Sequence, residues 1–178
     1  MRFVCTNPFI QSEDFTDKFC NLVLDTCENN QNGIIINNDL LEEYLRKKYP
    51  LYYFISSTTK CLENNNEIIT ELKKPYKYVC LSYTKNYDIL FLNSLSSDLK
   101  NKIELLINDK CYGKCPKRKG HYIAMSKSNY YYDSIYGDNY DCILINNPEK
   151  AIYTNRISYD QLNNYTKIGI NYFKLEGR

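Results

Sequence analysis

The stretch Asn32-Gly33-Ile34-Ile35-Ile36-Asn37-Asn38-Asp39 decides the fold of this chain. The Asn-Gly pair breaks a preceding helix, three isoleucines follow without a polar residue between them, and Asn38 and Asp39 open a second helix. An unbroken apolar run is typical of a strand that helices bury on both faces, as in parallel sheets. The stretch therefore predicts a strand followed by a helix, the unit from which α/β proteins are built.

The same order of strand and helix recurs along the chain. We expect strands at residues 3–5, 33–36, 52–56, 78–81, 103–107 and 172–175, all parallel in one sheet with helices outside. We expect helices after Ser12, from Asn38 to Tyr49, from Glu67 to Lys74, from Ile89 to Leu95, and after Ser158, which forms a capping box with Gln161. Repeated units of this kind give an open doubly wound sheet or a (β/α) barrel.

The chain is short for a complete eight-fold barrel. The 178 residues hold six or seven strand–helix units by this pattern, whereas an eight-fold barrel takes roughly 200 residues or more. No helix follows the strand that ends at residue 175. The sequence therefore predicts an α/β fold with a TIM-like (β/α) barrel that is incomplete, in a single domain over residues 1–178.

The composition excludes several classes of protein. Hydrophobic residues make up 43% and charged residues 25%, which is ordinary for a globular chain. A net charge of +2 does not indicate nucleic-acid binding, and no run approaches the roughly 18 apolar residues of a membrane span. Because the N-terminus lacks a signal-peptide pattern, we expect a cytoplasmic protein with reduced thiols. Of its eight cysteines, Cys20, Cys27 and Cys80 lie in apolar patterns and are expected in the core.

The most informative stretch for chemistry runs from Asn108 to Pro116. It follows an expected strand, and α/β proteins place their sites at the carboxyl ends of strands. Gly113 lies between Cys111 and Cys115 and lets the loop fold back, so that both sulfurs reach one metal. The alternative is that this spacing arises by chance in a chain with eight cysteines.

The segments after this loop carry fewer signals. His121, the only histidine, is a ligand, an acid–base group or a packing residue. Lys117-Arg118-Lys119 forms a solvated helix face or an anion-binding patch. Residues 126–141 are polar and predict a loop, and Cys142-Ile143-Leu144-Ile145 predicts a short strand.

The last expected strand alternates apolar and charged residues. Lys174, Glu176 and Arg178 share one face, because the side chains of a strand alternate. We expect Lys174 and Glu176 to point into the barrel mouth near the cysteine loop, and Phe173 and Leu175 to face the helices. With His121, Lys174 and Glu176 are the candidate catalytic residues, which would orient an anionic or polar substrate.

Residues 168–178, Ile-Gly-Ile-Asn-Tyr-Phe-Lys-Leu-Glu-Gly-Arg, resemble the G-(I/V)-x-x-F-K-(I/L)-E-G-R signature of the U32 peptidase family, also called collagenase-like. Residues 103–108, followed by Cys111 and Cys115, are similar to that family's E-L-(L/M)-(V/I)-N-x-x-C strand and loop. The loop at residues 56–60 also fits. The resemblance covers most of the chain.

The resemblance implies a TIM-like barrel. In many members it implies a [4Fe–4S] cluster held by four cysteines, in proteins that modify RNA bases or hydroxylate small aromatic precursors. Carried over residue by residue, Cys111 and Cys115 match best and Cys142 is a third ligand. Cys61 is the chosen fourth ligand, with Cys5 the next candidate. The resemblance does not name the substrate.

Two other classes of function stay open. Cys111, Cys115, His121 and Cys142 suit a closed Cys3His zinc site in a binding module, and such a module also exists without metal. The chain is alternatively an inactive fragment that needs a partner chain to complete the barrel. The sequence holds no Ser–His–Asp pattern and no H-E-x-x-H motif, so peptidase activity rests on the resemblance alone.

Overall fold

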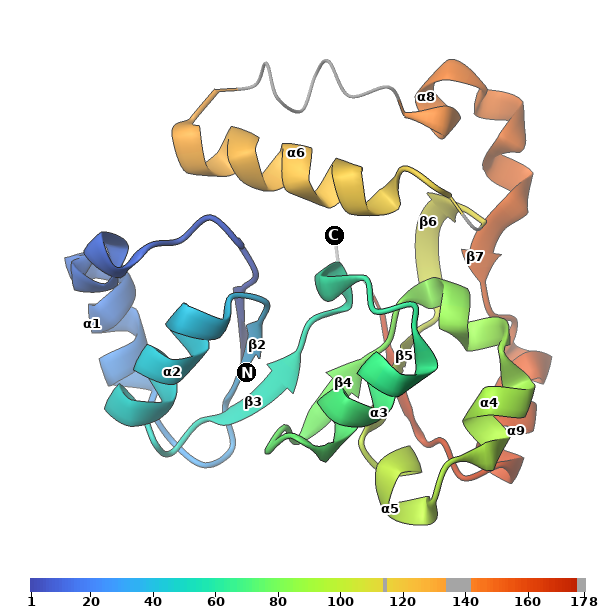
Figure 1. The fold of residues 1–178 in the computed structure, drawn as a ribbon, viewed down its shortest axis with the longest axis horizontal. Helices are drawn as coiled ribbons and strands as arrows, with labels where there is room; N and C mark the ends of the chain where they lie inside the picture. Colours follow the sequence, from blue (N-terminus) through green and yellow to red (C-terminus); the bar gives the residue numbers. More distant parts are fainter. Residues whose placement is uncertain (114, 134–141, 176–178) are drawn as a thin grey trace.

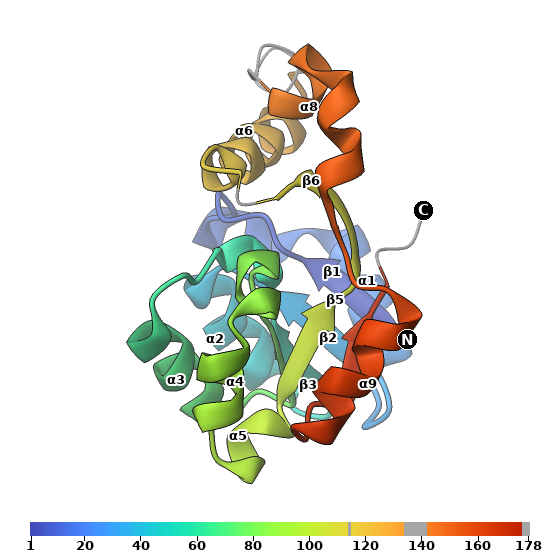
Figure 2. The same cartoon turned by 90° about the vertical axis from the view of Figure 1, so that its right-hand side faces the viewer.

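The computed structural model describes residues 1–113, 115–133 and 142–175. Six parallel strands form one sheet in the order β1-β2-β3-β4-β5-β8. The sheet curls into a half-barrel (Figures 1 and 2). The strands are β1 (Arg2–Cys5), β2 (Gly33–Ile36), β3 (Tyr53–Ser56), β4 (Tyr78–Cys80), β5 (Ile103–Leu106) and β8 (Tyr172–Lys174). The predicted parallel sheet is confirmed, and it is compatible with an incomplete barrel.

The helices follow the strands in the expected order. Between β1 and β5 lie η1 (Ser12–Thr16), α1 (Lys18–Cys27), α2 (Asp39–Lys48), η2 (Thr58–Lys60), α3 (Asn65–Lys73), η3 (Tyr83–Tyr87), α4 (Ile89–Ser94) and α5 (Ser97–Lys100). After β5 come β6 (Asn108–Tyr112), α6 (Arg118–Tyr131), α8 (Ile143–Asn146), η4 (Pro148–Tyr153), β7 (Thr154–Arg156) and α9 (Tyr159–Lys167). The predicted capping box of α9 is present, with the side chains of Ser158 and Gln161 each bonded to the other's backbone N–H.

The hydrophobic core lies between the convex face of the sheet and the helices. Ile34 pairs with Phe54 in the sheet, and both side chains are buried. Helix side chains cover them and their neighbours, among them Leu45 of α2, Ile68 of α3 and Leu92 of α4, which are also buried. Burial of apolar surface on this face is what holds the helices to the sheet.

The concave face of the sheet carries an ion pair that spans the curl. The Nη1 of Arg2, on β1, donates to the Oε1 of Glu104, on β5, at 2.5 Å. Three strands separate β1 from β5 in the sheet, so this contact requires the sheet to bend toward its concave face. The Arg2 guanidinium also lies 5.2 Å from the centre of the Tyr78 ring. Tyr78 in turn packs against Tyr172 of β8, with ring centres 4.6 Å apart.

Two segments of the chain differ from the sequence prediction. The loop predicted at residues 126–141 is wrong for residues 126–131, because α6 extends to Tyr131, and residues 134–141 fall outside the described residues. The predicted strand at 142–145 is also wrong, since residues 143–146 form α8. Short apolar runs fit a helix or a strand equally well. Tertiary contacts decide both cases, since α8 packs against β6 and η4.

The first helix also differs from its prediction. A 3-10 turn follows Ser12, and α1 begins at Lys18, where the Asp17 side chain accepts the Cys20 N–H at 2.6 Å. The apolar side chains of Phe19 and Leu22 are exposed. Cys20 is exposed too, so its assignment to the core is wrong, whereas Cys80 is buried as predicted and Cys27 is half-buried. Apolar spacing predicted a helix here but not which residues it buries.

A buried polar network joins β3 to α3. The Glu71 carboxylate accepts from Ser56 at 2.6 Å, from Lys60 at 2.7 Å and from Lys74 at 2.7 Å. Burial opposes ionisation of Glu71, but these hydrogen bonds outweigh it and lower the pKa of the carboxyl from 4.5 to about 2. The ionised carboxylate is thus held more favourably in the folded protein than in the unfolded chain.

This network predicts how stability depends on pH. Because the folded pKa of Glu71 is lowered, its contribution is present above pH 4.5 and is lost as pH falls from 4.5 toward 2. Glu71→Gln should lower the free energy of unfolding at pH 7 by about 3 kcal/mol, because it leaves Lys60 buried without its partner. Urea unfolding at pH 7 and at pH 3 measures both effects. The difference between wild type and variant should shrink at pH 3. Glu67→Gln, on the exposed side of α3, is the control.

Candidate functional site

The carboxyl ends of the parallel strands form the mouth of the half-barrel. After β3 and β4 the chain makes the short 3-10 turns η2 and η3. The Asn86 side chain, in η3, donates to the Leu106 carbonyl at 2.8 Å and so fixes this turn to the end of β5. The antiparallel pair β6–β7 extends beyond the mouth, and α6 crosses above it (Figure 1).

Contacts at both ends hold α6 across the mouth. Near its N-terminus α6 contacts η2 and η3. Further along, the Ser126 carbonyl accepts from the Asn7 side chain at 3.0 Å, and the Tyr130 hydroxyl donates to Asp14 at 3.0 Å. Asn7 and Asp14 belong to the segment between β1 and α1. The helix therefore bridges the two flanks of the half-barrel.

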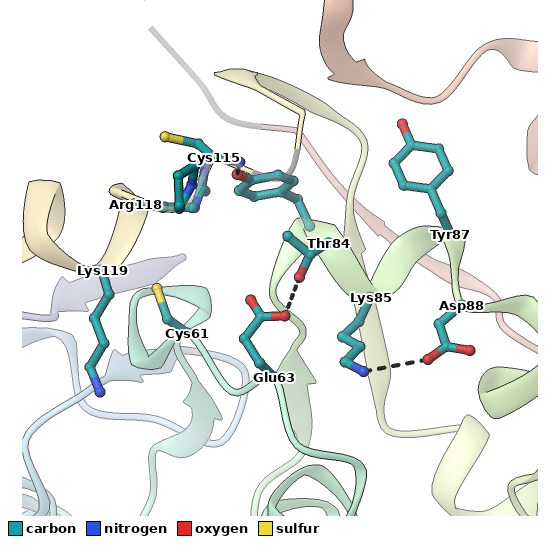
Figure 3. A pocket seen from close by; sticks show the side chains of 11 residues that line it. Cys61, Glu63, Thr84, Lys85, Tyr87, Asp88, Cys115, Arg118 and Lys119 are labelled. Carbon is teal, nitrogen blue, oxygen red and sulfur yellow. Dashed lines mark hydrogen bonds and ion pairs between the residues drawn. The ribbon is translucent and has the colours of Figure 1, made fainter. Parts of the chain in front are cut away.

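A cavity of about 650 Å3 lies at the mouth beside the N-terminal end of α6. Its walls come from the segments after β3 and β4 and from the start of α6 (Figure 3). The lining residues are Cys61, Glu63, Tyr83, Thr84, Lys85, Tyr87, Asp88, Cys115, Pro116, Arg118 and Lys119. The cavity thus brings thiols, carboxylates, ammonium groups and hydroxyls together in one hollow.

Arg118 lies at the centre of the cavity wall that the start of α6 forms. The residue is 7% exposed, and its Nη2 donates to the Asp109 carboxylate and to the Tyr122 hydroxyl. Its guanidinium stacks on Tyr83, 3.9 Å from the ring centre. Asp109 also accepts the Cys111 N–H at 2.6 Å. This ion pair therefore ties the first residue of α6 to β6 and η3.

Tyr83 forms hydrogen bonds to the backbone of the same wall. Its hydroxyl donates to the Tyr112 carbonyl at 3.2 Å and accepts the Cys115 N–H at 3.1 Å. The hydroxyl also lies 4.0 Å from the Cys111 sulfur. Burial raises the pKa of Tyr83, so the hydroxyl stays protonated and able to donate. Tyr83 thereby positions the backbone on both sides of the C-x3-C segment.

Three thiols lie near this wall. Burial raises the pKa values of Cys61 and Cys111, and the positive charge of Arg118 opposes the rise in both. The charge of Cys111 contributes to the raised pKa of Cys61, and that of Cys115 contributes to the raised pKa of Cys111. Cys61 has a φ of 51°, the left-handed region that few residues other than glycine and asparagine adopt. Two segments of the chain, Cys61 after η2 and the C-x3-C segment with Cys111 and Cys115, therefore bring thiols to the part of the mouth where Arg118 lies.

The charged groups on the floor of the cavity are already paired. Lys85 contacts Asp88 at 3.4 Å. The Glu63 carboxylate accepts from the Ser82 hydroxyl at 2.7 Å and from the Thr84 hydroxyl at 2.6 Å. Lys119, in contrast, is exposed and forms no ion pair with any residue that the structure describes.

The structure brings some of the predicted ligands together. Cys61 and Cys115 line the cavity and Cys111 lies close by, although Cys111 belongs to strand β6 rather than to the predicted loop. Cys142 precedes the first residue of α8, which packs against β6. Cys5, the last residue of β1, packs against the helix-side core. Within residues 1–113, 115–133 and 142–175, no three His, Cys, Asp or Glu side chains are arranged to hold one metal ion.

The structure describes two of the three predicted catalytic residues, His121 and Lys174. His121 is in α6 and does not line the cavity; burial and the charge of Arg118 lower its pKa. Lys174 lies on the concave face, where its charge acts on Cys80, a thiol whose pKa burial raises to about 12. Glu176 falls outside the described residues. Phe173 faces the helices and packs near Tyr165 as expected, but Leu175 is 67% exposed, so its predicted cover is absent.

Sequence reasoning missed the residues that build the cavity wall. The solvated helix face that it offered for residues 117–119 is wrong for Arg118, because this side chain is buried against Asp109 and Tyr83, and the alternative of an anion-binding patch stays a prediction. A signal was present, because Asp109 lies two residues after the strand expected at 103–107 and a basic run follows it within ten residues. Tyr83 and Lys85 carried no signal, since they lie between the strand expected at 78–81 and the helix expected from Ile89 to Leu95.

No protein-family model, curated protein or solved structure matches this chain. The U32 resemblance therefore has no support beyond the residues that suggested it. Among the described residues, no helix combines the length and the apolar character needed to cross a membrane.

The buried ion pair predicts a local effect on α6. Asp109→Asn should leave the Arg118 charge buried without its partner and lower the free energy of unfolding by about 3 kcal/mol. Hydrogen exchange followed by mass spectrometry should show faster exchange at residues 118–131 than in β2 or β3. Asp160→Asn, at an exposed position in α9, is the control and should leave α6 protected. Unchanged exchange in α6 of the Asp109 variant would contradict the anchoring role.

Proposed function

We propose that the protein binds a small polar molecule in the mouth cavity of an incomplete TIM-like (β/α) barrel. The observation that carries this proposal is the cavity itself, about 650 Å3 in volume at the carboxyl ends of parallel strands. Barrel enzymes place their active sites at this end. Its lining of thiols, carboxylates and ammonium groups suits a polar ligand better than an apolar one.

The specific form of this proposal is a U32-like iron–sulfur protein. Its support is that Cys61 and Cys115 line one cavity and that the positive charge of Arg118 acts on Cys61 and on Cys111. Thiolates are the ligands of iron–sulfur clusters, and a nearby positive charge offsets their negative charge. Cys142, beside β6, would supply the fourth ligand. Lys174, Glu176 and His121 would then orient the substrate or move protons, in a modification or hydroxylation reaction rather than peptide cleavage.

A zinc site is the second candidate. It would use Cys111, Cys115, His121 and Cys142 as a closed Cys3His set. One observation favours it: the pKa of His121 is lowered, so the imidazole is neutral near pH 7. The neutral imidazole is the form that binds zinc. In this form the protein would be a metal-stabilised binding module rather than an enzyme.

Anaerobic metal loading tests the metal forms of the proposal. Protein purified without oxygen and incubated with ferrous iron and sulfide should become brown and bind iron and inorganic sulfide in equal amounts. Cys111→Ser and Cys115→Ser should each remove most of the bound metal, because a serine hydroxyl is a poor ligand for iron or zinc. Metal and sulfide analysis of each variant provides the measurement. Cys20→Ser, exposed on α1, should leave loading unchanged.

The outcomes separate the candidates. Colour and sulfide depending on Cys61, Cys111 and Cys115 support the cluster. Colourless protein that binds one zinc ion, lost in His121→Ala but kept in Cys61→Ser, supports the zinc module. Loading that is equal in wild type and in the Cys111 and Cys115 variants would contradict both.

A partner chain that completes the barrel belongs to the same proposal. The two edge strands of the sheet, β1 and β8, are where such a chain would pair. Val4 of β1 is 70% exposed and Tyr172 of β8 is 40% exposed, which leaves apolar surface at both edges. The mouth cavity lies at the ends of β3 and β4, in the middle of the sheet, and its lining residues belong to neither edge strand.

A further inference from the structure

We propose that α6 is a lid over the mouth of the half-barrel, hinged at its N-terminal end and held shut at its far end by a latch of polar contacts. Release of the latch opens the mouth on the side of β1 and enlarges the space that a ligand in the cavity can enter. The inference rests on the proposed function for the presence of a ligand, and it adds how access to that ligand's site is regulated. Lids of this kind admit a ligand and then exclude water from it.

Burial of apolar surface contributes little to holding α6 in place. All fourteen residues of the helix are described, and Arg118 is the one that is buried. The hydrophobic core includes no side chain of α6, and Ile123 and Met125 are 39% and 43% exposed. Segments with few buried apolar contacts open at a lower free energy than the core does. The helix can therefore lift from the mouth while the sheet and its covering helices stay folded.

The N-terminal end of α6 is the fixed end. Arg118 pairs there with Asp109, which is 3% exposed, and the guanidinium stacks on Tyr83. The backbone N–H of Arg118 bonds to the Cys115 carbonyl at 3.3 Å. Breaking a buried ion pair is strongly unfavourable, because it leaves a charge away from water without its partner. This end therefore stays in place when the helix moves, and it serves as the hinge.

The far end of α6 is attached by weaker contacts to the segment between β1 and α1, which the helix reaches by crossing from β6 (Figure 1). The Tyr130 hydroxyl donates to Asp14 at 3.0 Å, and the Asn7 side chain donates to the Ser126 carbonyl at 3.0 Å. All four residues are half-buried. Water can replace such hydrogen bonds once the helix lifts, so each adds little net stability. This end is therefore the latch, and it opens more readily than the hinge.

The sequence allows a single fluorescent reporter at the latch. The chain contains no tryptophan. Phe9 is half-buried, and its ring centre lies 5.7 Å from the Lys127 ammonium of α6. Phe9→Trp therefore places one tryptophan between the lid and its flank without a change of charge. Acrylamide is a small polar molecule that quenches tryptophan on contact, so its quenching constant measures how often this interface is open.

Acrylamide quenching of the Phe9→Trp protein, alone and with a second substitution, tests the lid. Tyr130→Phe removes one latch hydrogen bond and should raise the quenching constant by about twofold or more, because the interface is open for more of the time. Asn7→Asp should act in the same direction, since it removes the donor to α6 but keeps the acceptor for the N–H of residue 9. Tyr159→Phe, at a position in α9 that is 81% exposed, is the matched control and should leave quenching unchanged.

Hydrogen exchange followed by mass spectrometry, on the chain that keeps Phe9, locates the hinge. In Tyr130→Phe, residues 5–14 should exchange several times faster than in wild type, because the lid leaves this segment more often. Residues 108–112 of β6 should keep their wild-type rates, because the pair of Arg118 with Asp109 is intact. Circular dichroism and thermal unfolding should stay close to wild type.

The proposal is overturned if the two latch variants are quenched no more than the Tyr159→Phe control. It is also overturned if β6 exchanges faster together with residues 5–14, since α6 would then detach as a whole, or if the latch variants lower the stability of the entire chain. Neither measurement uses a metal or a ligand. Failure of metal loading with an opening lid, or a rigid α6 with intact metal loading, therefore distinguishes this proposal from the proposed function.

Discussion

The mouth of this half-barrel depends on one buried ion pair, between Arg118 and Asp109. Removing two charges from water costs several kcal/mol for each ion, and only good geometry with further contacts repays it. Here the guanidinium also stacks on Tyr83, and Asp109 also accepts the Cys111 N–H. The pair therefore does more than join two side chains. It fixes the direction in which the chain leaves β6 and the point at which α6 begins, and the cavity wall follows from both.

A second ion pair, between Arg2 and Glu104, plays the corresponding role inside the sheet. It connects β1 to β5 over the concave face, while the hydrophobic core holds the helices on the convex face. Glycine at position 33 belongs to the same arrangement, because a Cβ there would lie 2.3 Å from the Tyr53 ring that covers it. The curl of the sheet thus results from polar and aromatic contacts on one face and from apolar burial on the other.

The sequence was enough to predict the strands of the sheet, but it was not enough to predict which residues form the mouth, and the reasons are physical. Ile34 to Ile36 and Ile103 to Leu106 are buried on both faces, so their apolar runs identified strands without any knowledge of their neighbours. The alternation of apolar and charged residues predicted which way the side chains of β8 face: Phe173 toward the helices and Lys174 away from them. Helix α6 has no such pattern, because single long-range contacts hold it, such as that between Tyr130 and Asp14. No local rule relates residues so far apart in the chain.

Each of the two ion pairs leaves one polar atom without a hydrogen-bond partner, and the two atoms lie in different surroundings. Glu104 keeps one carboxylate oxygen, and Arg118 keeps its Nε, without a hydrogen-bond partner among the described residues. The oxygen of Glu104 belongs to the concave face of the sheet, where the pair with Arg2 already holds β1 and β5 together. Arg118, however, lines a cavity large enough for a ligand and stands at the start of a helix whose first turn is basic. A fold that needed only the ion pair would gain by placing an acid at this helix end. The basic run at residues 117–119 instead adds positive charge at the positive end of the helix dipole, and the buried carboxylate of Asp109 offsets the charge of Arg118 there.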